Sequence, residues 1–467
     1  MIAECDFLVI GGGPGGTPTA MALASAGKKV VLVEKGPGLG GTCLFEGCIP
    51  SKILRESARR LREIREARDF GLCMPSDDVR IDWYAIQERK RAILRKRSIA
   101  AAKNVVQIPS LELFNGSASL LDATQARLVS HEGEESTITF KQAIIATGST
   151  PSRPPIPGIE HHRVVDSEAI LDIDHIPTRL VIIGAGPIGV ELGQIFNTFG
   201  SEVRLLEVGP RILGPVDHEL AELLEQQMIN DGIDITTSCH IKRISNTGDG
   251  VFVEYTNAEK ESFHRLADTV LLVTGRHPNV DGLGLENTQI QHGPHGIAVN
   301  EQLQTDEHNI FAVGDVIGQP MFAHWATAQG LALARNLLGQ AVPFPDPHTN
   351  SAVIFSEPEI GIVGMTESQA KSAGIEYRVA RYNYAADARA QIAGRDSGQL
   401  KILYEAENHK VIGVHALVEG ADDLMGEAAV AVRAGLPLEV IAGSIHPHPT
   451  LTESFAVAAR VALAKKI

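Results

Sequence analysis

One pattern constrains the fold more than any other: a stretch of about thirty residues occurs twice in the chain. It reads CDFLVIGGGPGGTPTAMALASAGKKVVLVEK at 5–35 and TRLVIIGAGPIGVELGQIFNTFGSEVRLLEV at 178–208. Each copy runs from an apolar strand through a glycine-rich turn and a helix to a second strand that ends in glutamate. In both copies a glycine ends the helix 16 positions after the first glycine of the turn, and the glutamate follows at 23. Chance glycine turns would not keep this register twice, so we predict two units that each bind a dinucleotide.

Three glycines and one glutamate have distinct roles in each unit. The first glycine allows the tight turn, the second lets the backbone approach a pyrophosphate, and the third lets helix pack on strand. The helix N-terminus adds unpaired N–H groups and partial positive charge. The glutamate can accept hydrogen bonds from ribose hydroxyls. These residues are Gly11, Gly13, Gly16 and Glu34 in the first unit, and Gly184, Gly186, Gly189 and Glu207 in the second.

Glu207 also bears on the choice between the two nicotinamide cofactors. A carboxylate there repels the 2′-phosphate of NADP, whereas an arginine would bind it. Arg204 and Arg211 lie near it in the sequence, so the discrimination is not absolute. We predict NAD as the ligand of the second unit.

Composition narrows the class of protein. The chain has 467 residues, enough for about three domains, and a formal net charge of −15, which disfavours a nucleic-acid partner. Five cysteines do not make a secreted disulfide scaffold. The first strand begins almost at once, with no leader before it, and no apolar run is long enough to span a membrane. We therefore expect a cytoplasmic protein.

Two cysteines, Cys43 and Cys48, stand in the stretch LGGTCLFEGCIPSK at 39–52. No second cysteine pair or Cys–His cluster accompanies them, so a structural metal site lacks its ligands. Cys48 lies near the start of an amphipathic segment, where a helix N-terminus and Lys52 both favour thiolate over thiol. Lys52 shares a face with Cys48 if the helix includes the cysteine. This positioning favours a redox pair, while Cys5, Cys73 and Cys239 are expected to be buried thiols.

The order of motifs carries a resemblance. GGTCLFEGCIPSK, ATGS, GRHPN, FAVGDV and HPHPTLTE follow one another along the chain. Together with the two dinucleotide units, they resemble the pyridine nucleotide–disulfide oxidoreductases, and within them the dihydrolipoamide dehydrogenases. The resemblance implies an α/β fold with two Rossmann-like domains, the NAD-binding one (151–276) inserted into the FAD-binding one (1–150 and 277–345). Residues 346–467 would form an α+β dimerisation domain.

The resemblance also implies roles for single residues. Cys43 would exchange with substrate, Cys48 would face the flavin, and His448, paired with Glu453, would be the base that reaches the cysteines of the other subunit of a homodimer. Lys52 would lie near the flavin and pair with Glu191. The remaining implied cofactor-lining residues are Gly116, Thr147, Gly148, Ser149, Asp315, Met321, Phe322, Ala323 and His324 for FAD, and Ile241 and Gly275 for NAD.

The implied activity is oxidation of protein-bound dihydrolipoamide by NAD⁺ through FAD and a Cys43–Cys48 disulfide. The partner would be a lipoylated carrier protein or acyltransferase core. Phe45 and Glu46 stand where the family usually has Asn-Val, which keeps open a related disulfide reductase with another substrate. A non-catalytic flavoprotein that only docks on a lipoyl carrier is the alternative from a different class.

Two basic helical stretches stand out in this acidic chain: KILRESARRLREIREARD and ERKRAILRKRSIAAAKN. Such stretches can steer an acidic partner domain. More often they are solvated helix faces whose charges pair at i,i+4, and we favour that interpretation for both.

Overall fold

The computed structural model describes residues 3–73 and 79–464. The chain forms two compact units, each built from three segments: 1–153, 166–175 and 274–345 in the first, and 154–165, 176–273 and 346–467 in the second. No helix within the described ranges is long and apolar enough to cross a membrane.

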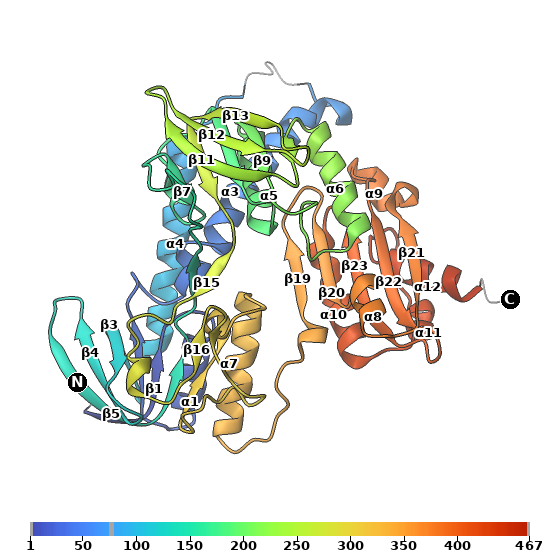
Figure 1. Cartoon of the computed structure of the whole chain (residues 1–467). Coiled ribbons are helices and arrows are strands. Elements are labelled where there is room, and N and C mark those ends of the chain that lie inside the picture. The colour runs from blue at the N-terminus through green and yellow to red at the C-terminus, as the bar shows by residue number, and fades with distance from the viewer. Residues whose placement is uncertain (1–2, 74–78, 465–467) are drawn as a thin grey trace. The chain divides into compact units, whose positions relative to one another are not determined.

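The first unit is built on one six-stranded sheet (Figure 1). Five strands run parallel in the order β3-β2-β1-β5-β18, and β4 joins the long strands β3 and β5 as an antiparallel neighbour of both. The strands β1, β2 and β18 are almost wholly buried, as strands covered by helices on both faces usually are. Their bounds are β1 (Glu4–Ile10), β2 (Val30–Glu34), β3 (Leu111–Leu120), β4 (Gln125–Ser130), β5 (Glu135–Ile145) and β18 (Ile310–Ala312).

Helices α1 (Gly16–Ser25) and α7 (Ala323–Leu337) pack closely together. Gly330 makes this contact possible, because a Cβ there would lie 2.6 Å from the Gly15 carbonyl oxygen. The two short strands β6 (Ser149–Pro151) and β15 (Arg276–Pro278) pair antiparallel.

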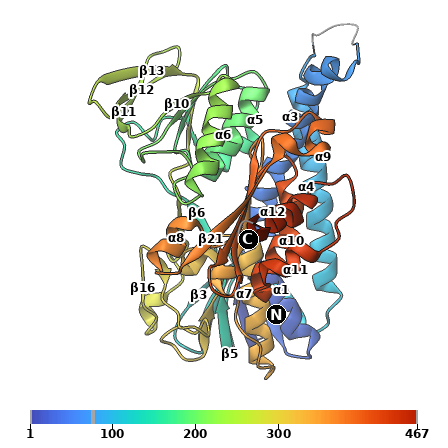
Figure 2. The same ribbon diagram turned by 90° about the vertical axis from the view of Figure 1, so that its right-hand side faces the viewer.

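Three further helices of the first unit follow β2: α2 (Gly41–Phe45), α3 (Cys48–Glu66) and α4 (Trp83–Val106). Figure 2 shows α3 and α4 side by side. Lys90 of α4 is buried and donates to the Leu171 carbonyl and, over 2.8 Å, to Asp172. This contact joins residues 166–175 to the first unit.

The second unit begins with a sheet in the order β10-β9-β8-β14-β7. Its parallel strands are β8 (Arg179–Ile183), β9 (Glu202–Leu206), β10 (Asp234–Thr236) and β14 (Thr269–Leu272), with β7 (Val164–Asp166) at the edge. Its helices are α5 (Pro187–Thr198) and α6 (His218–Asn230). A three-stranded antiparallel sheet follows, of β11 (His240–Asn246), β12 (Val251–Thr256) and β13 (Ser262–Ala267).

The C-terminal part of the second unit is a five-stranded antiparallel sheet, which Figure 1 shows in orange and red. Its strands, in order, are β19 (Ser351–Ile354), β20 (Ile360–Gly364), β23 (Val411–Leu417), β22 (Gln399–Glu405) and β21 (Tyr377–Asn383). Helices α8 (Glu367–Ser372), α10 (Ala421–Ala434) and α12 (Glu453–Ala464) accompany it. The predicted fold class, with one nucleotide-binding sheet inserted in another and an α+β C-terminal part, is confirmed. The domain boundaries stay a prediction.

Of the three cysteines that were predicted to be buried, Cys5, Cys73 and Cys239, only two are buried. Cys5 and Cys239 are buried, and burial raises the pKa of the first thiol to about 12 and of the second to about 11. The prediction for Cys73 is wrong, because this cysteine is exposed. It follows the short 3-10 turn Ala67–Phe70 and stands beside Phe70 and Leu72, which are themselves exposed.

Candidate active site

In the first glycine turn, close backbone contacts leave no room for a side chain at two of the glycines, as the sequence predicts. Gly11 adopts a φ of +108°, and a Cβ there would lie 2.3 Å from the Ala146 carbonyl oxygen. A Cβ on Gly16 would lie 1.8 Å from the Gly11 carbonyl oxygen, so this glycine sets the helix against the strand end. A Cβ on Gly13 would meet only the Gly41 Cα, at 3.9 Å. Gly13 therefore borders open space, and a ligand can lie there close to the backbone of the turn.

The second turn repeats this arrangement. Gly184 has a φ of +110°, and a Cβ on Gly189 would lie 2.1 Å from the Gly184 carbonyl oxygen. A Cβ on Gly186 would meet nothing within 4 Å. Helices α1 and α5 begin directly at these turns, so both open positions lie where helix N–H groups favour a phosphate. The residues present therefore fit one dinucleotide in each unit.

The two glutamates have matching partners. The Glu34 carboxylate accepts hydrogen bonds from the N–H groups of Gly12 (2.7 Å) and Gly36 (2.5 Å). The Glu207 carboxylate accepts from Ala185 (2.6 Å) and Gly209 (2.7 Å). In each unit the acid thus fixes the glycine turn on one side and its own strand end on the other. The expected ribose contact would use the remaining lone pairs of these oxygens.

The cysteine segment is built against the first glycine turn. Gly40 and Gly41 precede Cys43 and have φ values of +126° and +55°. A Cβ on Gly41 would lie 2.9 Å from the Gly13 Cα, and the Gly40 N–H donates to the Gly12 carbonyl over 2.9 Å. The glycine pair therefore lets α2 approach the site expected for a pyrophosphate.

The two cysteines stand at different points of their helices. Cys43 lies in the middle of α2 and is half-buried, whereas Cys48 is the first residue of α3 and is exposed. Both are thiols in this structure. A hydrogen bond with Cys48 and burial raise the pKa of Cys43, with Lys52 and Arg97 acting in the opposite direction. The position of Cys48 at a helix N-terminus favours the thiolate form of that sulfur.

A chain of polar contacts that the sequence did not reveal surrounds Ser149. Its hydroxyl donates to Asp315 over 2.6 Å and accepts from Arg276 Nε over 2.8 Å. Arg276 also donates to the Ser149 carbonyl over 2.7 Å and to Glu168 over 3.2 Å. Burial and the neighbouring Glu46 raise the pKa of Glu168. The sequence signal for this network was Arg276 of the GRHPN motif, because it is a charged residue directly after a strand that ends in Thr-Gly.

The other predicted lining residues lie in the following places. Thr147 donates to the Asn279 carbonyl over 2.8 Å, and Gly148 has a φ of +73° with open space at its Cβ position. Gly116 in β3 would clash with the Val129 carbonyl oxygen if it carried a Cβ. Met321 and Ala323 are half-buried near the start of α7, where the exposed rings of Phe322 and His324 stack at 5.3 Å. Ile241 is buried in β11, and Gly275 has a φ of +109°.

Glu191 has a partner that we did not predict. Its carboxylate accepts from the Phe355 N–H over 2.9 Å. One helical turn further along α5, Gln194 exchanges two hydrogen bonds with the backbone of Glu357, each of 2.9 Å. These contacts join α5 to the segment between β19 and β20. The expected ion pair of Glu191 with Lys52 stays a prediction.

His448 and Glu453 form the predicted imidazole–carboxylate pair. His448 Nδ1 lies 3.1 Å from Glu453 Oε2, and the same oxygen accepts from the Thr450 N–H over 3.1 Å. Those two contacts, the backbone one first, lower the pKa of Glu453, so it is a carboxylate and Nδ1 carries the proton. Nε2 is then the basic nitrogen. His446, two residues earlier, instead contacts Glu427 over 2.9 Å.

Two family models match the chain. That of pyridine nucleotide-disulphide oxidoreductase covers residues 5–330, and that of the dimerisation domain of the same enzymes covers 350–459. This chain belongs to the pyridine nucleotide-disulphide oxidoreductases. The family resemblance predicted from the motifs is confirmed.

Relatives extend over almost the whole chain. The dihydrolipoyl dehydrogenase of Geobacillus stearothermophilus is 37% identical, over 99% of this chain and 97% of its own length. One from Bacillus subtilis (strain 168) is 36% identical over the same shares. Among solved structures, the Cu(II) complex of the HOCl-induced flavoprotein disulfide reductase RclA from Escherichia coli matches with a TM-score of 0.88 at 28% identity. That match covers 98% of this chain and 99% of the other.

Proposed function

We propose that this protein oxidises dihydrolipoamide carried by another protein and passes the electrons to NAD⁺. The observation that carries the proposal is the seating of the Cys43–Cys48 pair directly on the first of two dinucleotide turns, through Gly41 and Gly13. Full-length relatives named dihydrolipoyl dehydrogenase support it.

FAD and NAD are the cofactors of this activity. The turn of Gly11, Gly13 and Gly16 with Glu34 would hold FAD, because it adjoins the dithiol. The turn of Gly184, Gly186 and Gly189 with Glu207 would hold NAD. When bound, the two cofactors would supply the hydride-transfer chemistry that no side chain provides.

The residues of the chain handle sulfur and protons. Starting from the Cys43–Cys48 disulfide, a dihydrolipoyl thiolate attacks the Cys43 sulfur, the disulfide bond breaks, and Cys48 leaves as a thiolate. The second lipoyl thiol then attacks the mixed disulfide, which releases lipoamide and the Cys43 thiol. The substrate has lost two electrons and the enzyme dithiol has gained them. Of the two protons that the lipoyl thiols lose, one passes to the Cys43 sulfur as it leaves and the other is accepted by His448 Nε2, with Glu453 holding the ring.

Two features favour the division of labour between the cysteines. Its contact with Cys48 and burial raise the pKa of Cys43, which favours the protonated form of that sulfur. Cys48 is the first residue of α3, with Lys52 one turn later, and both the helix N-terminus and a nearby cation favour a thiolate there. Cys43 is thus suited to exchange and Cys48 to electron transfer.

The proposal extends to partners and location. The dimerisation-domain match over 350–459 supports a homodimer. In it, the partner subunit's His448 would serve the dithiol of the first chain. The substrate would be a lipoylated carrier or acyltransferase core in the cytoplasm.

A second candidate is reduction of a different disulfide by NADH. Glu46 is exposed between the cysteines, so a carboxylate stands beside the dithiol, and its charge adds to the burial that raises the pKa of Glu168. Such a border favours a substrate that is not itself acidic at its disulfide. The RclA relative, named a disulfide reductase, adds weight to this alternative.

Anaerobic titration of the purified flavoprotein separates the two candidates. Dihydrolipoamide should produce a long-wavelength absorbance band that Cys48→Ser abolishes, and NADH should reduce the protein faster than NADPH. A flavin that NADH reduces but dihydrolipoamide leaves oxidised would overturn the lipoamide assignment and favour the other disulfide.

A further inference from the structure

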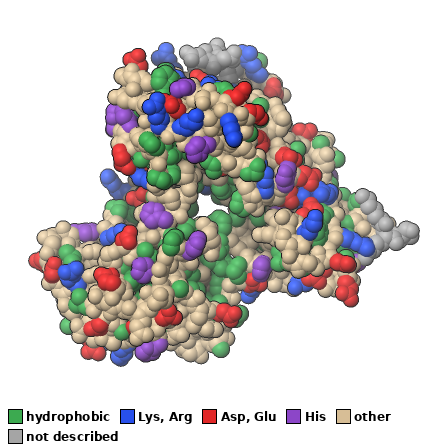
Figure 3. Space-filling model, in the orientation of Figure 1, with side chains coloured by type: hydrophobic (Ala, Val, Ile, Leu, Met, Phe, Trp, Pro, Cys, Tyr) green, Lys and Arg blue, Asp and Glu red, His purple; other side chains and the backbone are tan. Residues whose placement is uncertain are grey.

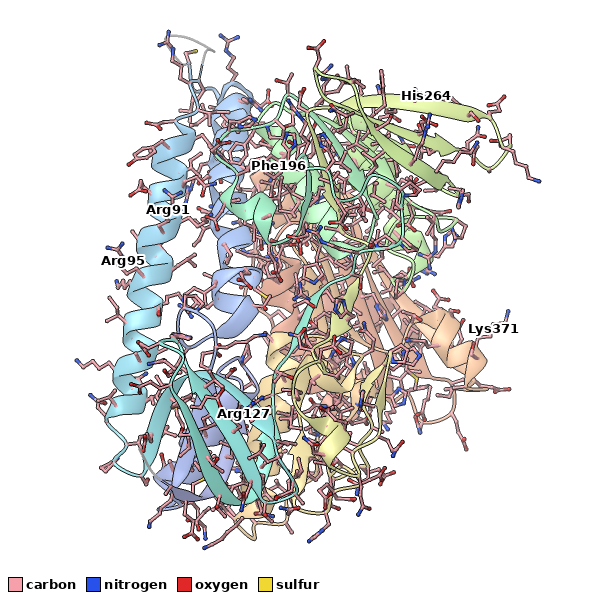
Figure 4. The ribbon with its side chains drawn as sticks, turned by 60° about the vertical axis from the view of Figure 1, so that its left-hand side comes forward. Arg91, Arg95, Arg127, Phe196, His264 and Lys371 are labelled. Carbon is pink, nitrogen blue, oxygen red and sulfur yellow. The ribbon has the colours of Figure 1, made fainter. Side chains whose placement is uncertain are left out.

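The charged side chains of the two basic helices lie at the surface and pair locally or face solvent. On α3, two arginines pair with two glutamates one turn away, in the contacts Arg59–Glu56, Arg59–Glu63, Arg60–Glu56 and Arg60–Glu63. This confirms the predicted interpretation for α3. On α4, Arg91 pairs with Glu88 over 2.7 Å, and Figure 4 shows Arg95 projecting away from the helix. Acidic and basic side chains are also interspersed on the face of the molecule that Figure 3 shows.

Arg276 differs from these surface arginines, because its side chain is only 15% exposed and its guanidinium contacts one residue twice. Nε donates to the Ser149 hydroxyl over 2.8 Å, and Nη2 donates to the Ser149 carbonyl over 2.7 Å. Nη2 also donates to Glu168 over 3.2 Å. The pairing of β15 with β6 brings the arginine and the serine together, with Arg276 opposite Pro151. The flat fork of a guanidinium suits such a double contact, and the ammonium of a lysine does not.

The arginine fixes the direction of the next hydrogen bond in the network. A guanidinium can only donate, so the Ser149 oxygen accepts from Arg276 Nε. The single hydroxyl proton of Ser149 then goes to Asp315, whose carboxylate accepts it over 2.6 Å. Ser149 is 3% exposed, so water has little access to this proton. Arg276 therefore acts on Asp315 through Ser149.

Asp315 lies at the edge of the first sheet where a dinucleotide is expected. Three parallel strands, β1, β5 and β18, end in register, at Ile10, Ile145 and Ala312. The first glycine turn and Asp315 both follow directly after these ends, and ligands of such sheets bind at the carboxyl ends of the strands. The turn and the end of β18 are also in contact, because a Cβ on Gly15 would lie 3.2 Å from Val313 Cγ2.

The backbone beside Asp315 is fixed independently of its side chain. The Gly314 N–H donates over 2.9 Å to Oε1 of Gln329, a buried residue of α7. Asp315 is thus held through its backbone by Gln329 and through Oδ2 by Ser149. Its second oxygen, Oδ1, then faces one direction only, in which it can accept from a hydroxyl group of a ligand.

We propose that Arg276 is a positioning residue for FAD: by directing the Ser149 proton to Asp315, it fixes the carboxylate that binds a hydroxyl group of the cofactor. Glu168 holds the guanidinium in the orientation that this requires. The inference rests on the proposed function and adds to it a residue that acts on the cofactor through two others.

The test measures how fast FAD leaves the holoenzyme after dilution, followed by the rise in flavin fluorescence. Arg276→Met and Ser149→Ala should each speed the release about tenfold, because each leaves Asp315 without its directed hydrogen bond. Since the arginine acts through the serine, the double variant should release FAD no faster than Ser149→Ala does. Two independent contributions would instead multiply to about a hundredfold.

Two other arginines of the first unit provide matched controls. Arg153 follows β6 and pairs with Asp166 over 3.2 Å, two residues before Glu168. Arg127 is exposed on β4 and is labelled in Figure 4. Arg153→Met and Arg127→Met remove the same charge as Arg276→Met, and both should release FAD at the wild-type rate.

Three results would overturn the proposal: a wild-type rate in Arg276→Met or Ser149→Ala, a double variant near the product of the two single effects, or an equal acceleration in Arg153→Met. If Arg276→Met does not fold, Glu168→Gln replaces it. That variant removes the charge that orients the guanidinium, and it should speed release about two- to threefold alone and not at all on top of Ser149→Ala.

Release of FAD requires no thiol substrate. A wild-type protein that does not oxidise dihydrolipoamide would therefore overturn the proposed function, while the rates of FAD release would still decide the role of Arg276.

Discussion

At the residue scale, the paired glutamates are the sharpest test of the two cofactor sites. Each carboxylate accepts two backbone N–H groups, whereas a glutamine has one acceptor oxygen. Glu207→Gln should therefore leave the N–H of Ala185 or Gly209 unpaired, at a cost of about 1–3 kcal/mol. We expect KM for NADH to rise about tenfold with KM for dihydrolipoamide unchanged.

The matched variant Glu34→Gln serves as the control for this prediction. It should weaken retention of flavin, measured by absorbance after gel filtration, and leave KM for NADH near the wild-type value. An unchanged KM for NADH in Glu207→Gln would contradict the assignment of the second turn.

A second residue, His415, should make folding depend on pH. It is fully buried, and its Nε2–H donates to the Met365 carbonyl over 2.7 Å, so the ring is neutral. Burial lowers its pKa below the ordinary 6.5. The unfolded chain therefore binds an extra proton below about pH 6.5, and stability falls as pH falls through that value, by up to about 1.4 kcal/mol per pH unit.

His415→Gln should remove this slope. Lys401, Asp217 and Glu367 act on His415 and remain in the variant, so they form the common background. The measurement is the urea midpoint between pH 7.5 and 5.5. A variant whose midpoint falls with pH as steeply as the wild type would show that other groups dominate.

The residues whose roles were predictable are those with local causes. The roles of the glycines follow from their spacing within one turn of the chain. The start of a helix at Cys48 follows from the amphipathic pattern of the residues after it. Ser149 and Asp315 lie 166 positions apart, and Glu191 and Phe355 lie 164 apart. No spacing rule links such pairs, because the chain brings them together only when the sheets have formed.

At the scale of elements, a buried ionic cluster joins β22 to α6 and α8. Lys401 is 2% exposed and contacts Asp217 (2.7 Å), Glu367 (2.6 Å) and Glu219 (3.1 Å). Burial lowers the pKa of Lys401, but its hydrogen bonds to Asp217 and Glu367 outweigh burial and raise it. The ammonium thus stays charged and holds the start of α6 against the C-terminal sheet.

Lys401→Met should destabilise the protein, because it leaves the buried Asp217 carboxylate without its cation. Breaking such a pair costs about 3–5 kcal/mol. Chemical denaturation should show this loss, and Lys371→Met on exposed α8 should change stability by under about 0.5 kcal/mol. A loss in Lys401→Met as small as in the control would mean that water or rearrangement replaces the cluster.

At the scale of the whole molecule, the internal repeat predicted the architecture better than any single residue did. Corresponding residues of the two glycine turns make corresponding contacts. Gly16 and Gly189 each pack against the carbonyl oxygen of the first glycine of their turn, and Glu34 and Glu207 each accept a hydrogen bond from a backbone N–H of that turn. The proposed homodimer is a different case, because its contacts join residues of two chains, and no spacing along one chain relates such residues. His448 shows the difficulty: its side chain is 75% exposed, which is unusual for a general base.

The exposure of His448 is explained if the base serves the dithiol of the partner subunit, and a hybrid dimer tests this. Cys43→Ser and His448→Ala should each abolish lipoamide turnover as homodimers. In a hybrid of the two, one site combines the intact Cys43 of one chain with the intact His448 of the other. Co-expressed and separated by distinct affinity tags, the hybrid should recover up to about half of the wild-type kcat. A hybrid as inactive as its parents would place both residues of each site in one chain.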